Sequence, residues 1–568
     1  MNRFTFSLLL VLLGSAMAAY VQTDAGSVTV KDIRFTGESG NRLSALLYLP
    51  DTVTPASPAP GILAVHGYIN SRETQSGFAI ELAKRGFVVL ALDQMGHGYS
   101  DPPAFAAGFG GPDGLAYLRS LDAVDPERIG LTGHSMGGWT VQVAAASAPD
   151  DYQSMVLLGS STGTFGAPEG TPTSPRNLLL VFSLFDEFSN LMWGAAIPRD
   201  IVWTPKLMKL FDTEAAVEPG RLYGDLDSGT ARVLLMPPVT HPGDHLSREA
   251  IAATVNWFER TLGAPVPPSG QTWFFKELAT GAALVGLACL LFPLIDWLLG
   301  LAMFCSVIRE VPRPRPVTSL RWWSGATLAA LVPVFLFFPL QTLANLVLPP
   351  NPLLPQTITN GVLLWAWGLG LVNLALFGLW LRGSGMDRTQ LGLPANTGVI
   401  VRTMCLALIV MLVTYVILVA CAWLFTVDFR FWVVALKPMS FMQFGAFVVY
   451  LPLFALFFLV LSLMLHNPLR RVGSSGWTNA GILSLGFVAL LALQYLPLLS
   501  GGTMTIASQP LLTIVAFQFV PLLVLVAMVS TFCFERTGAI YLGAWINALV
   551  VTWYMVAGTA TQAVPFWF

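Results

Sequence analysis

The chain has 568 residues, 54% of them hydrophobic, and its mean hydropathy is +0.65. These values are too high for an ordinary soluble protein and predict a membrane protein. The formal net charge of −2 gives no sign of nucleic-acid binding. Only 17 of the 62 charged residues lie from Leu278 onward, so we expect a soluble first half and a membrane second half.

The first residues have the pattern of a secretory signal. Arg3 lies in a positive start, residues 4–13 form a short apolar core, and residues 16–18 read Ala-x-Ala, a candidate cleavage site. An uncleaved signal anchor is the alternative, although the apolar run is short for one. We assign residues 1–19 to a signal peptide or signal anchor and expect the domain after residue 19 to be carried across the membrane.

Strand and helix patterns alternate over residues 20–262, which predicts an α/β domain with a mostly parallel sheet. We expect an opening hairpin over 32–35 and 43–49, and a closing helix over 248–261. An amphipathic helix is expected over 78–85, and the other strands over 61–65, 87–91, 128–132, 154–158, 177–182 and 232–236. Residues 263–278, which begin with a Pro- and Gly-rich run, are the predicted linker to a membrane domain over 279–568.

The most informative motif is G-x-S-x-G at residues 133–137. It follows the strand pattern 128–132 and precedes a pattern of small residues that predicts a helix over 139–146. Strand, sharp turn and helix form the context of a nucleophile elbow, which exposes a serine at the edge of a sheet. Ser135 is therefore the candidate nucleophile. The alternative is a Gly-rich turn that only connects two elements.

A serine hydroxyl needs an adjacent base, and a third group must orient that base. Asp186 comes just after the apolar strand 177–182 and is the predicted orienting acid. Glu187 is the neighbouring alternative, and since adjacent side chains should point apart, only one of the two can serve. His241 follows the last strand almost directly and is favoured as the base, with His245 as the alternative.

An oxyanion hole needs backbone N–H groups aimed at the developing charge. We expect one from Met136, directly after the nucleophile, and one from Tyr68, in the loop after strand 61–65. His241 and His245 have the spacing of a helical zinc site, but the Pro and Gly between them exclude a helix. We therefore expect no metal and no cofactor. All five cysteines lie in the apolar half, so the soluble half has no thiol chemistry.

Taken together, these residues resemble the α/β-hydrolase superfamily, and most of all its dienelactone-hydrolase and serine-aminopeptidase-like branch. The resemblance covers about residues 30–261 and rests on His66-Gly67, the segment 93–100, the G-x-S-x-G motif, Asp186 and the terminal histidine, in that order. It implies a doubly wound, mostly parallel sheet and a serine hydrolase. The chain departs from the lipase branch that carries an HGGG-type loop, and it has no N-terminal propeller of the oligopeptidase type.

The segment 188–230 is longer than a simple connection and carries an apolar set of side chains. We expect these side chains to pack on the sheet. The alternative is an acyl-chain surface that faces the lipid.

Beyond the linker, about eight apolar stretches have spanning length. They lie near 279–307, 323–347, 361–381, 403–426, 441–465, 479–499, 510–533 and 539–558. Within them, Asp296 is the one acid well inside a stretch and is a functional candidate, unless it faces a neighbouring helix or the lipid boundary.

The charges of the connecting loops predict the orientation. With the hydrolase-like half outside, the outside loops hold only Arg430 and Lys437. The inside loops then hold Arg309, Arg313, Arg315, Arg321, Arg382, Arg388, Arg402, Arg470, Arg471 and Arg536. This distribution agrees with the positive-inside rule. We expect a multi-pass protein of the cell membrane with an extracytoplasmic hydrolase domain and with the C-terminal tail, to Phe568, on the same side.

The sequence thus predicts a membrane-anchored serine hydrolase that cleaves an ester or related acyl bond through an acyl-enzyme. Its partners would be the lipid bilayer and a small-molecule, lipid or peptide substrate, and no nucleic acid. One alternative is a serine peptidase acting on short peptides. Another is a ligand-binding domain of a transporter or receptor that performs no catalysis.

Overall fold

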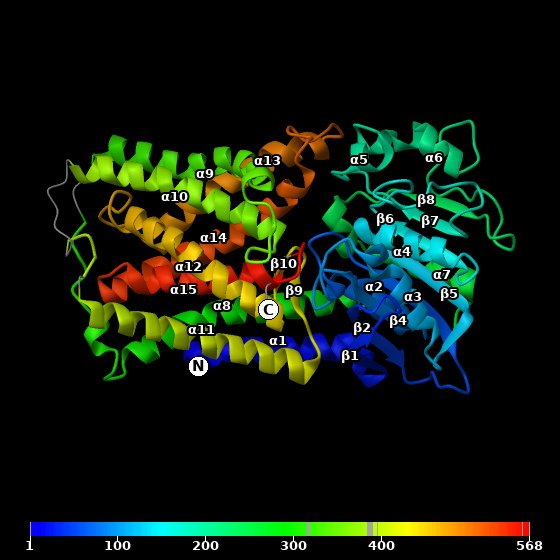
Figure 1. Ribbon diagram of the computed structural model, residues 1–568, viewed down its shortest axis with the longest axis horizontal. Helices are drawn as coiled ribbons and strands as arrows, with labels where there is room; N and C mark the ends of the chain where they lie inside the picture. The colour runs from blue at the N-terminus through cyan, green and yellow to red at the C-terminus, as the bar shows by residue number, and fades with distance from the viewer. Residues whose placement is uncertain are drawn as a thin grey trace.

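A computed structural model of the chain describes residues 2–267, 269–314, 318–382, 390–394, 396–558 and 561–566. A mixed sheet flanked by helices forms one end of the molecule, and a bundle of long helices forms the other (Figure 1). Arg315 and Arg388, which we count among the inside charges, lie outside the described residues.

Eight strands form one sheet in the order β1-β2-β4-β3-β5-β6-β7-β8. They are β1 (Val28–Thr36), β2 (Arg42–Pro50), β3 (Ala59–Val65), β4 (Val88–Asp93), β5 (Val124–His134), β6 (Ser154–Leu158), β7 (Leu178–Val181) and β8 (Arg232–Leu235). Strand β2 pairs antiparallel with β1 and β4, and all the other pairs are parallel. The predicted hairpin and mostly parallel sheet are confirmed.

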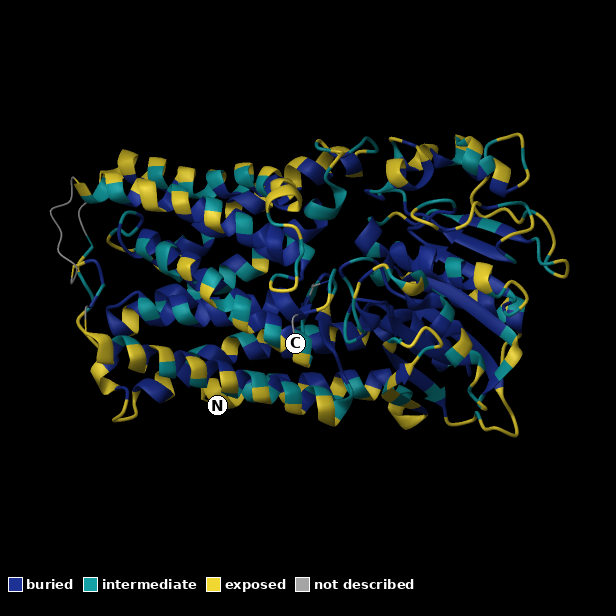
Figure 2. Ribbon diagram, viewed as in Figure 1, coloured by how far each residue is buried: buried dark blue, intermediate teal, exposed yellow. Residues whose placement is uncertain are grey.

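Helices cover both faces of this sheet, because the parallel strands are apolar on both sides. Helices α2 (Ser76–Ala83) and α7 (Arg248–Leu262) pack on one face, and α3 (Gly111–Arg119) and α4 (Met136–Ser147) on the other. The strands between them are largely buried (Figure 2). This two-sided cover is the doubly wound arrangement that we expect from the resemblance.

The segment 188–230 packs mainly on the soluble domain, as predicted. It contains the short helices α5 (Ser189–Trp193) and α6 (Pro205–Leu210). Met192, Trp193 and Leu207 are buried in the same core as α3 and α4. Trp203 is an exception and is exposed.

Nine helices within the described residues are long and apolar enough to cross a membrane. They are α1 (Arg3–Gln22), α8 (Trp273–Leu299), α9 (Ser319–Val347), α10 (Thr357–Arg382), α11 (Thr397–Phe425), α12 (Phe441–His466), α13 (Gly476–Leu499), α14 (Pro510–Thr537) and α15 (Tyr541–Trp553), which runs on to Gly558 as a π-turn. The eight predicted stretches correspond to α8–α15. Many large apolar side chains on the outer faces of these helices are exposed, as lipid-facing side chains would be.

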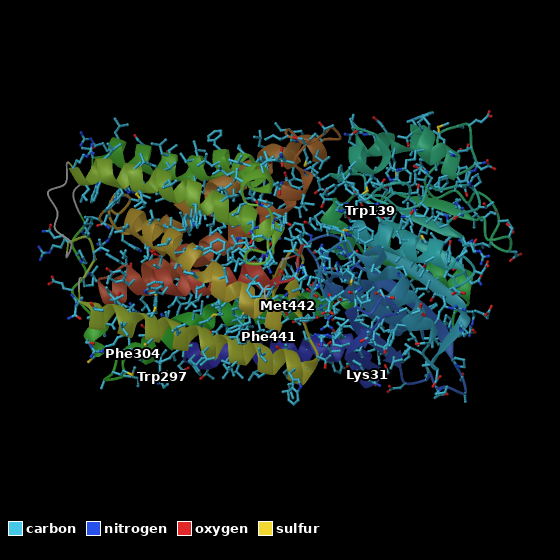
Figure 3. The ribbon with its side chains drawn as sticks, in the orientation of Figure 1. Lys31, Trp139, Trp297, Phe304, Phe441 and Met442 are labelled. Carbon is cyan, nitrogen blue, oxygen red and sulfur yellow. The ribbon has the colours of Figure 1, made fainter. Side chains whose placement is uncertain are left out.

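Two features of α8 differ from the sequence analysis. The helix begins at Trp273, earlier than predicted, and its first turn packs on α2: the Trp273 nitrogen donates to the Glu81 carboxylate at 3.0 Å and Lys276 donates to Ser76 at 3.1 Å. Lys276 is therefore buried, in a 3.2 Å ion pair with Glu277, instead of facing solvent. Asp296 lies about one turn from the end of α8 and not well inside the span. Its carboxylate pairs with Arg536 at 2.8 Å, and both side chains are partly exposed. Trp297 and Phe304 mark this end of the bundle, far from Trp139 in the sheet half (Figure 3).

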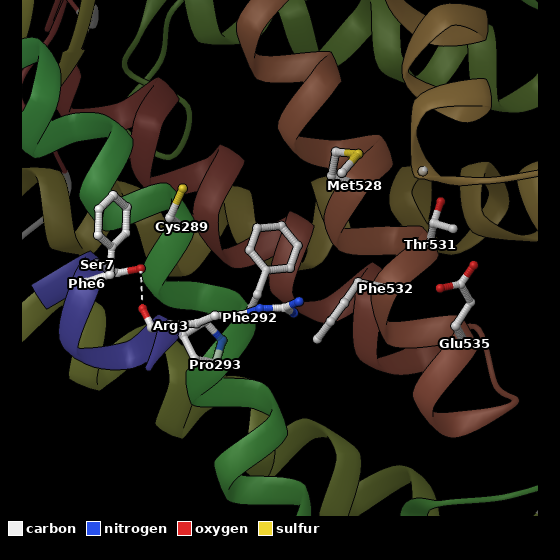
Figure 4. Close-up of a pocket in the computed structure, with 11 residues that line it drawn as sticks. Arg3, Phe6, Ser7, Cys289, Phe292, Pro293, Met528, Thr531, Phe532 and Glu535 are labelled. Atoms are coloured by element: carbon white, nitrogen blue, oxygen red, sulfur yellow. Dashed lines mark hydrogen bonds between the residues drawn. The ribbon is translucent and has the colours of Figure 1, made fainter. Parts of the chain in front are cut away.

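Helix α1 packs against α8 through small residues. A Cβ atom on Gly14 would approach the Ala279 carbonyl to 2.7 Å, and one on Gly286 would approach the Val11 nitrogen to 2.9 Å. Small residues of this kind let membrane helices come into close contact. A cavity of about 510 Å³ lies where α1, α8 and α14 meet (Figure 4). The N-terminal helix is thus an integral part of the bundle.

A short hairpin between α11 and α12 joins the bundle to the sheet domain. It consists of β9 (Phe429–Phe431) and β10 (Val434–Leu436). The carboxylate of Glu73, in the turn before α2, accepts hydrogen bonds from Arg430 at 2.9 Å and Lys437 at 2.7 Å. All three side chains are almost fully buried. The two cations that we place in the outside loops are therefore ion partners of the sheet domain.

The C-terminal residues also contact the sheet domain. The backbone of Gln562 donates to the Gly96 carbonyl at 2.7 Å and accepts from the Ala104 nitrogen at 2.9 Å. Thr561 lies within hydrogen-bond distance of His97, at 3.1 Å. The described part of the tail therefore lies at the same end of the bundle as the sheet domain, as the loop charges predict for the tail.

Replacement of Glu73 by Gln tests the buried ion cluster. Arg430 would lose its carboxylate partner and Lys437 would keep only the more distant Asp428, at 4.0 Å, and breaking a buried pair costs about 3–5 kcal/mol. We expect a clearly lower melting temperature of the detergent-solubilised protein. Glu218→Gln is the control, because Glu218 pairs with Arg221 on the surface. Equal melting temperatures for the two variants would contradict a stabilising role of the cluster.

Candidate active site

Ser135 occupies a sharp turn between β5 and α4. Its φ of 54° and ψ of −120° place it in a region that non-glycine residues seldom adopt, so the turn is strained. The flanking glycines are a steric requirement. A Cβ atom on Gly133 would overlap the Gly137 carbonyl, and one on Gly137 would overlap the Val65 carbonyl of β3. The G-x-S-x-G motif thus forms the strand–turn–helix geometry of a nucleophile elbow.

The two predicted oxyanion donors flank Ser135. Met136 is the first residue of α4, where backbone N–H groups have no partner within the helix. Tyr68 lies in the loop after β3, and this loop approaches the elbow closely. A Cβ atom on Gly67 would lie 3.1 Å from the Cβ of Ser135. Tyr68, Ser135 and Met136 all line one cavity.

Asp186 and His241 meet directly. The Nδ1 atom of His241 lies 2.8 Å from Oδ2 of Asp186, and both side chains are buried. The other oxygen of Asp186 accepts a 2.7 Å hydrogen bond from the Phe188 nitrogen, which fixes the carboxylate. With Nδ1 bound in this way, Nε2 remains for proton exchange, and His241 lines the same cavity as Ser135.

The surroundings of His241 raise its pKa above the ordinary value. Burial alone would lower it, but the charge and hydrogen bond of Asp186 outweigh burial, and Glu187 and Asp244 act in the same direction. The site therefore stabilises the protonated imidazole more than water would.

Glu187, the alternative acid, points away from Asp186 and contacts other groups. Its carboxylate accepts the backbone N–H of His241 at 2.7 Å and the hydroxyl of Tyr495 at 2.5 Å. Burial, followed by the charge of Asp186, raises its pKa to about 7. Because Tyr495 belongs to α13, a helix of the bundle contacts the residue next to the candidate acid.

His245, the alternative base, also lines the cavity but is not paired with Asp186. Its ring packs against that of His134, with centroids 4.1 Å apart. Burial, followed by the charge of His241, lowers its pKa to about 3. His134 in turn lies with Nε2 2.9 Å from the His241 carbonyl. The geometry therefore favours His241 over His245 as the partner of the acid.

The cavity has a volume of about 480 Å³ and lies between the two halves of the molecule. Its walls include Trp432 of the β9–β10 hairpin and Leu511 and Ile514 of α14. Sequence reasoning does not assign these residues to the site, because it gives no distances between the two halves. The available signal in the sequence is a pair of cations in an otherwise weakly charged half, Arg430 within β9 and Lys437 directly after β10, which both contact Glu73.

No group of three or more His, Cys, Asp or Glu side chains that could hold a metal ion occurs within the described ranges. The cavity brings Ser135 together with His241, whose ring has the carboxylate of Asp186 behind it, and His134 and His245 also line it.

Comparison with known proteins identifies the domain. Residues 60–215 match the family model described as the alpha/beta hydrolase fold. An uncharacterised protein of Mycobacterium tuberculosis is 34% identical over 220 residues, which are 38% of this chain and 56% of that protein. The monoacylglycerol lipase of Mycolicibacterium smegmatis is 28% identical over 217 residues, which are 37% of this chain and 71% of the lipase. The chain thus spans about half the length of the first of these relatives.

Among solved structures, a dienelactone hydrolase-like promiscuous phosphotriesterase from metagenomic libraries matches 42% of this chain and 100% of its own. The identity is 16% and the TM-score 0.31. An esterase of Pyrococcus furiosus matches 42% of this chain and 96% of its own, with 17% identity and a TM-score of 0.31. Residues 60–215 thus belong to an alpha/beta hydrolase fold built on a mostly parallel sheet, and a C-terminal region of long apolar helices follows this domain.

Proposed function

We propose that the protein is a membrane-anchored serine hydrolase that cleaves an ester or related acyl bond. The observation that carries this proposal is the 2.8 Å hydrogen bond between Asp186 and His241, beside the strained turn of Ser135 and in one cavity with it. The α/β-hydrolase family and the esterase and lipase relatives support hydrolysis as the reaction class.

Each residue has a defined role in the proposed reaction. Ser135 Oγ attacks the acyl carbon while His241 Nε2 takes the hydroxyl proton. Asp186 holds the imidazole in orientation and stabilises its charge. The Tyr68 and Met136 N–H groups stabilise the oxyanion. The protonated His241 then gives its proton to the leaving alcohol, and a water molecule, activated by the same histidine, releases the acid from the acyl-enzyme.

We also propose that the protein crosses the cell membrane several times, with the hydrolase domain outside the cytoplasm. The cluster of arginines in the opposite loops supports this orientation by the positive-inside rule. The position of the C-terminal residues beside the hydrolase domain agrees with an even number of spans after it.

The apolar lining of the cavity favours an acyl ester over a charged peptide as substrate. Aromatic side chains such as Phe105, Trp139 and Phe188 line the cavity together with Ser135. The described lining contains no Lys, Arg, Asp or Glu that would pair with the charged terminus of a peptide. Hydrolysis of short peptides is the second candidate. A receptor domain without catalysis is the third, and it predicts no acyl-enzyme.

A fluorophosphonate probe tests the nucleophile. We expect the full-length protein in detergent to be labelled, because an activated serine forms a stable phosphonyl ester, and we expect Ser135→Ala to abolish labelling. Ser147→Ala, in the last turn of the same helix, is the control and should label normally. Labelling that survives Ser135→Ala would contradict the assignment, and an unlabelled wild-type protein would favour the receptor hypothesis.

The pH profile tests the histidine. His241 must be neutral to accept the proton, and its pKa is raised above 6.5. We therefore expect kcat/KM for an acetate ester to fall toward acid pH with a midpoint above 6.5. Asp186→Asn removes the carboxylate charge, so it should shift the midpoint down and lower kcat by roughly ten-thousand-fold. A profile and rate unchanged in Asp186→Asn, as in the exposed control Glu218→Gln, would refute the pairing.

We further propose that α1 is retained as a signal anchor and not cleaved. Its close contacts with α8, in which Gly14 faces Ala279 and Val11 faces Gly286, support this assignment, because cleavage would remove one wall of the bundle. An epitope tag fused to the N-terminus should remain on the protein purified from membranes. A purified protein that begins near residue 19 and lacks the tag would show that the segment is a cleaved signal.

A further inference from the structure

The cavity at Ser135 continues into the membrane half of the molecule. Besides the residues of the hydrolase domain, its lining includes Pro510, Leu511, Ile514 and Gln518, all on one side of α14. From Pro510 to Gln518 an α-helix rises about 12 Å. The cavity therefore follows the first two turns of a helix that is long and apolar enough to span a bilayer.

The lining of this extension suits a hydrocarbon chain. Leu511 and Ile514 contribute aliphatic side chains, and Trp432 and Val433 of the hairpin contribute two further apolar ones. The one amide in this wall, Gln518, already accepts a 2.6 Å hydrogen bond from the Tyr554 hydroxyl. An apolar chain would gain from burial here, whereas a charged group would find no Lys, Arg, Asp or Glu among the described lining residues to pair with.

The wall of the cavity formed by α14 and the β9–β10 hairpin is held in a fixed position relative to the loop that carries His241. The indole N–H of Trp432 donates to the carbonyl of Pro242, directly after His241, at 2.9 Å. The Trp432 ring also packs against Phe517 of α14, with centroids 4.8 Å apart. On the other side, Tyr495 contacts Glu187. A chain lying along α14 would therefore end at a constant distance from Ser135.

The opposite end of the cavity is apolar as well and reaches the surface. The rings of Phe165 and Trp139 stack with centroids 4.8 Å apart, and Phe105 and Phe165 are both more than half exposed. The part of a substrate on the other side of the acyl carbon would extend past these exposed rings toward the surface.

We propose that the substrate is an ester of a long-chain acyl group, and that α14 and the β9–β10 hairpin bind the chain and limit its length. The inference rests on the proposed function of Ser135. The acyl carbonyl lies at the elbow, with its chain along Leu511 and Ile514. Ser135 Oγ bonds to the acyl carbon, the alcohol leaves with the proton from His241, and water then releases the fatty acid. Such esters partition into the bilayer that α14 spans.

The length of the acyl chain provides the test. Ile514→Trp would fill the extension, and we expect the ratio of kcat/KM for a laurate ester to that for an acetate ester to fall by roughly tenfold or more. Ile514→Ala lengthens the extension and should shift the preferred ester toward longer acyl groups. Leu496→Trp is the matched control, because Leu496 is exposed on the outer face of α13 and does not line the cavity. It should leave the ratio unchanged.

The outcomes separate this inference from the proposed function. Fluorophosphonate labelling of each variant shows whether its elbow is intact. If the wild-type protein is labelled but prefers acetate to laurate, or if both Ile514 variants keep the wild-type ratio, the chain-binding role of α14 is wrong. If the wild-type protein is not labelled at all, the proposed hydrolase function itself fails.

Discussion

The buried ion cluster of Glu73, Arg430 and Lys437 is the contact on which the arrangement of the two halves depends. Two cations at a hairpin of the helical bundle neutralise a carboxylate of the hydrolase domain. Each charge is costly to bury alone, so the two halves are held in one relative position. Arg72 extends the cluster, because its guanidinium contacts Asp32 and Asp428. The position of Trp432 over the cavity results from this docking.

Because the two halves are docked in this way, the bundle covers part of the cavity of the hydrolase domain. In an α/β sheet the ligand lies at the carboxyl ends of the strands, and here the β9–β10 hairpin and α14 cover that edge. The bundle therefore contributes a wall of the cavity as well as an anchor. Tyr495 reaches Glu187, whose other oxygen holds the backbone of His241. His241, the proposed base, is thus positioned in part through a helix of the bundle, which links the integrity of the bundle to the geometry of the site.

Much of the fold is predictable because local patterns specify it. The strands of the sheet are continuous apolar runs, and the helices of the bundle are long apolar segments with few charges. The G-x-S-x-G motif is readable for a steric reason, since the carbonyls of Gly137 and Val65 exclude any side chain at the two glycines. By contrast, the start of α8 is mispredicted, because its first turn is held by hydrogen bonds to Glu81 and Ser76 of α2, which are distant in sequence and leave no local pattern.

Periodicity, motif spacing and composition are local properties of the chain, and they suffice for the hydrolase family, the order of serine, acid and histidine, and the helical membrane half. They favour Asp186 over Glu187 and His241 over His245 only by position after a strand, because the alternatives lie within four residues of the favoured ones. The pairing of Asp186 with His241, and the turn of Glu187 toward Tyr495, emerge from the packed structure. The same holds for Trp432 and Ile514 beside Ser135, since contacts between residues hundreds of positions apart arise from packing and leave no local pattern.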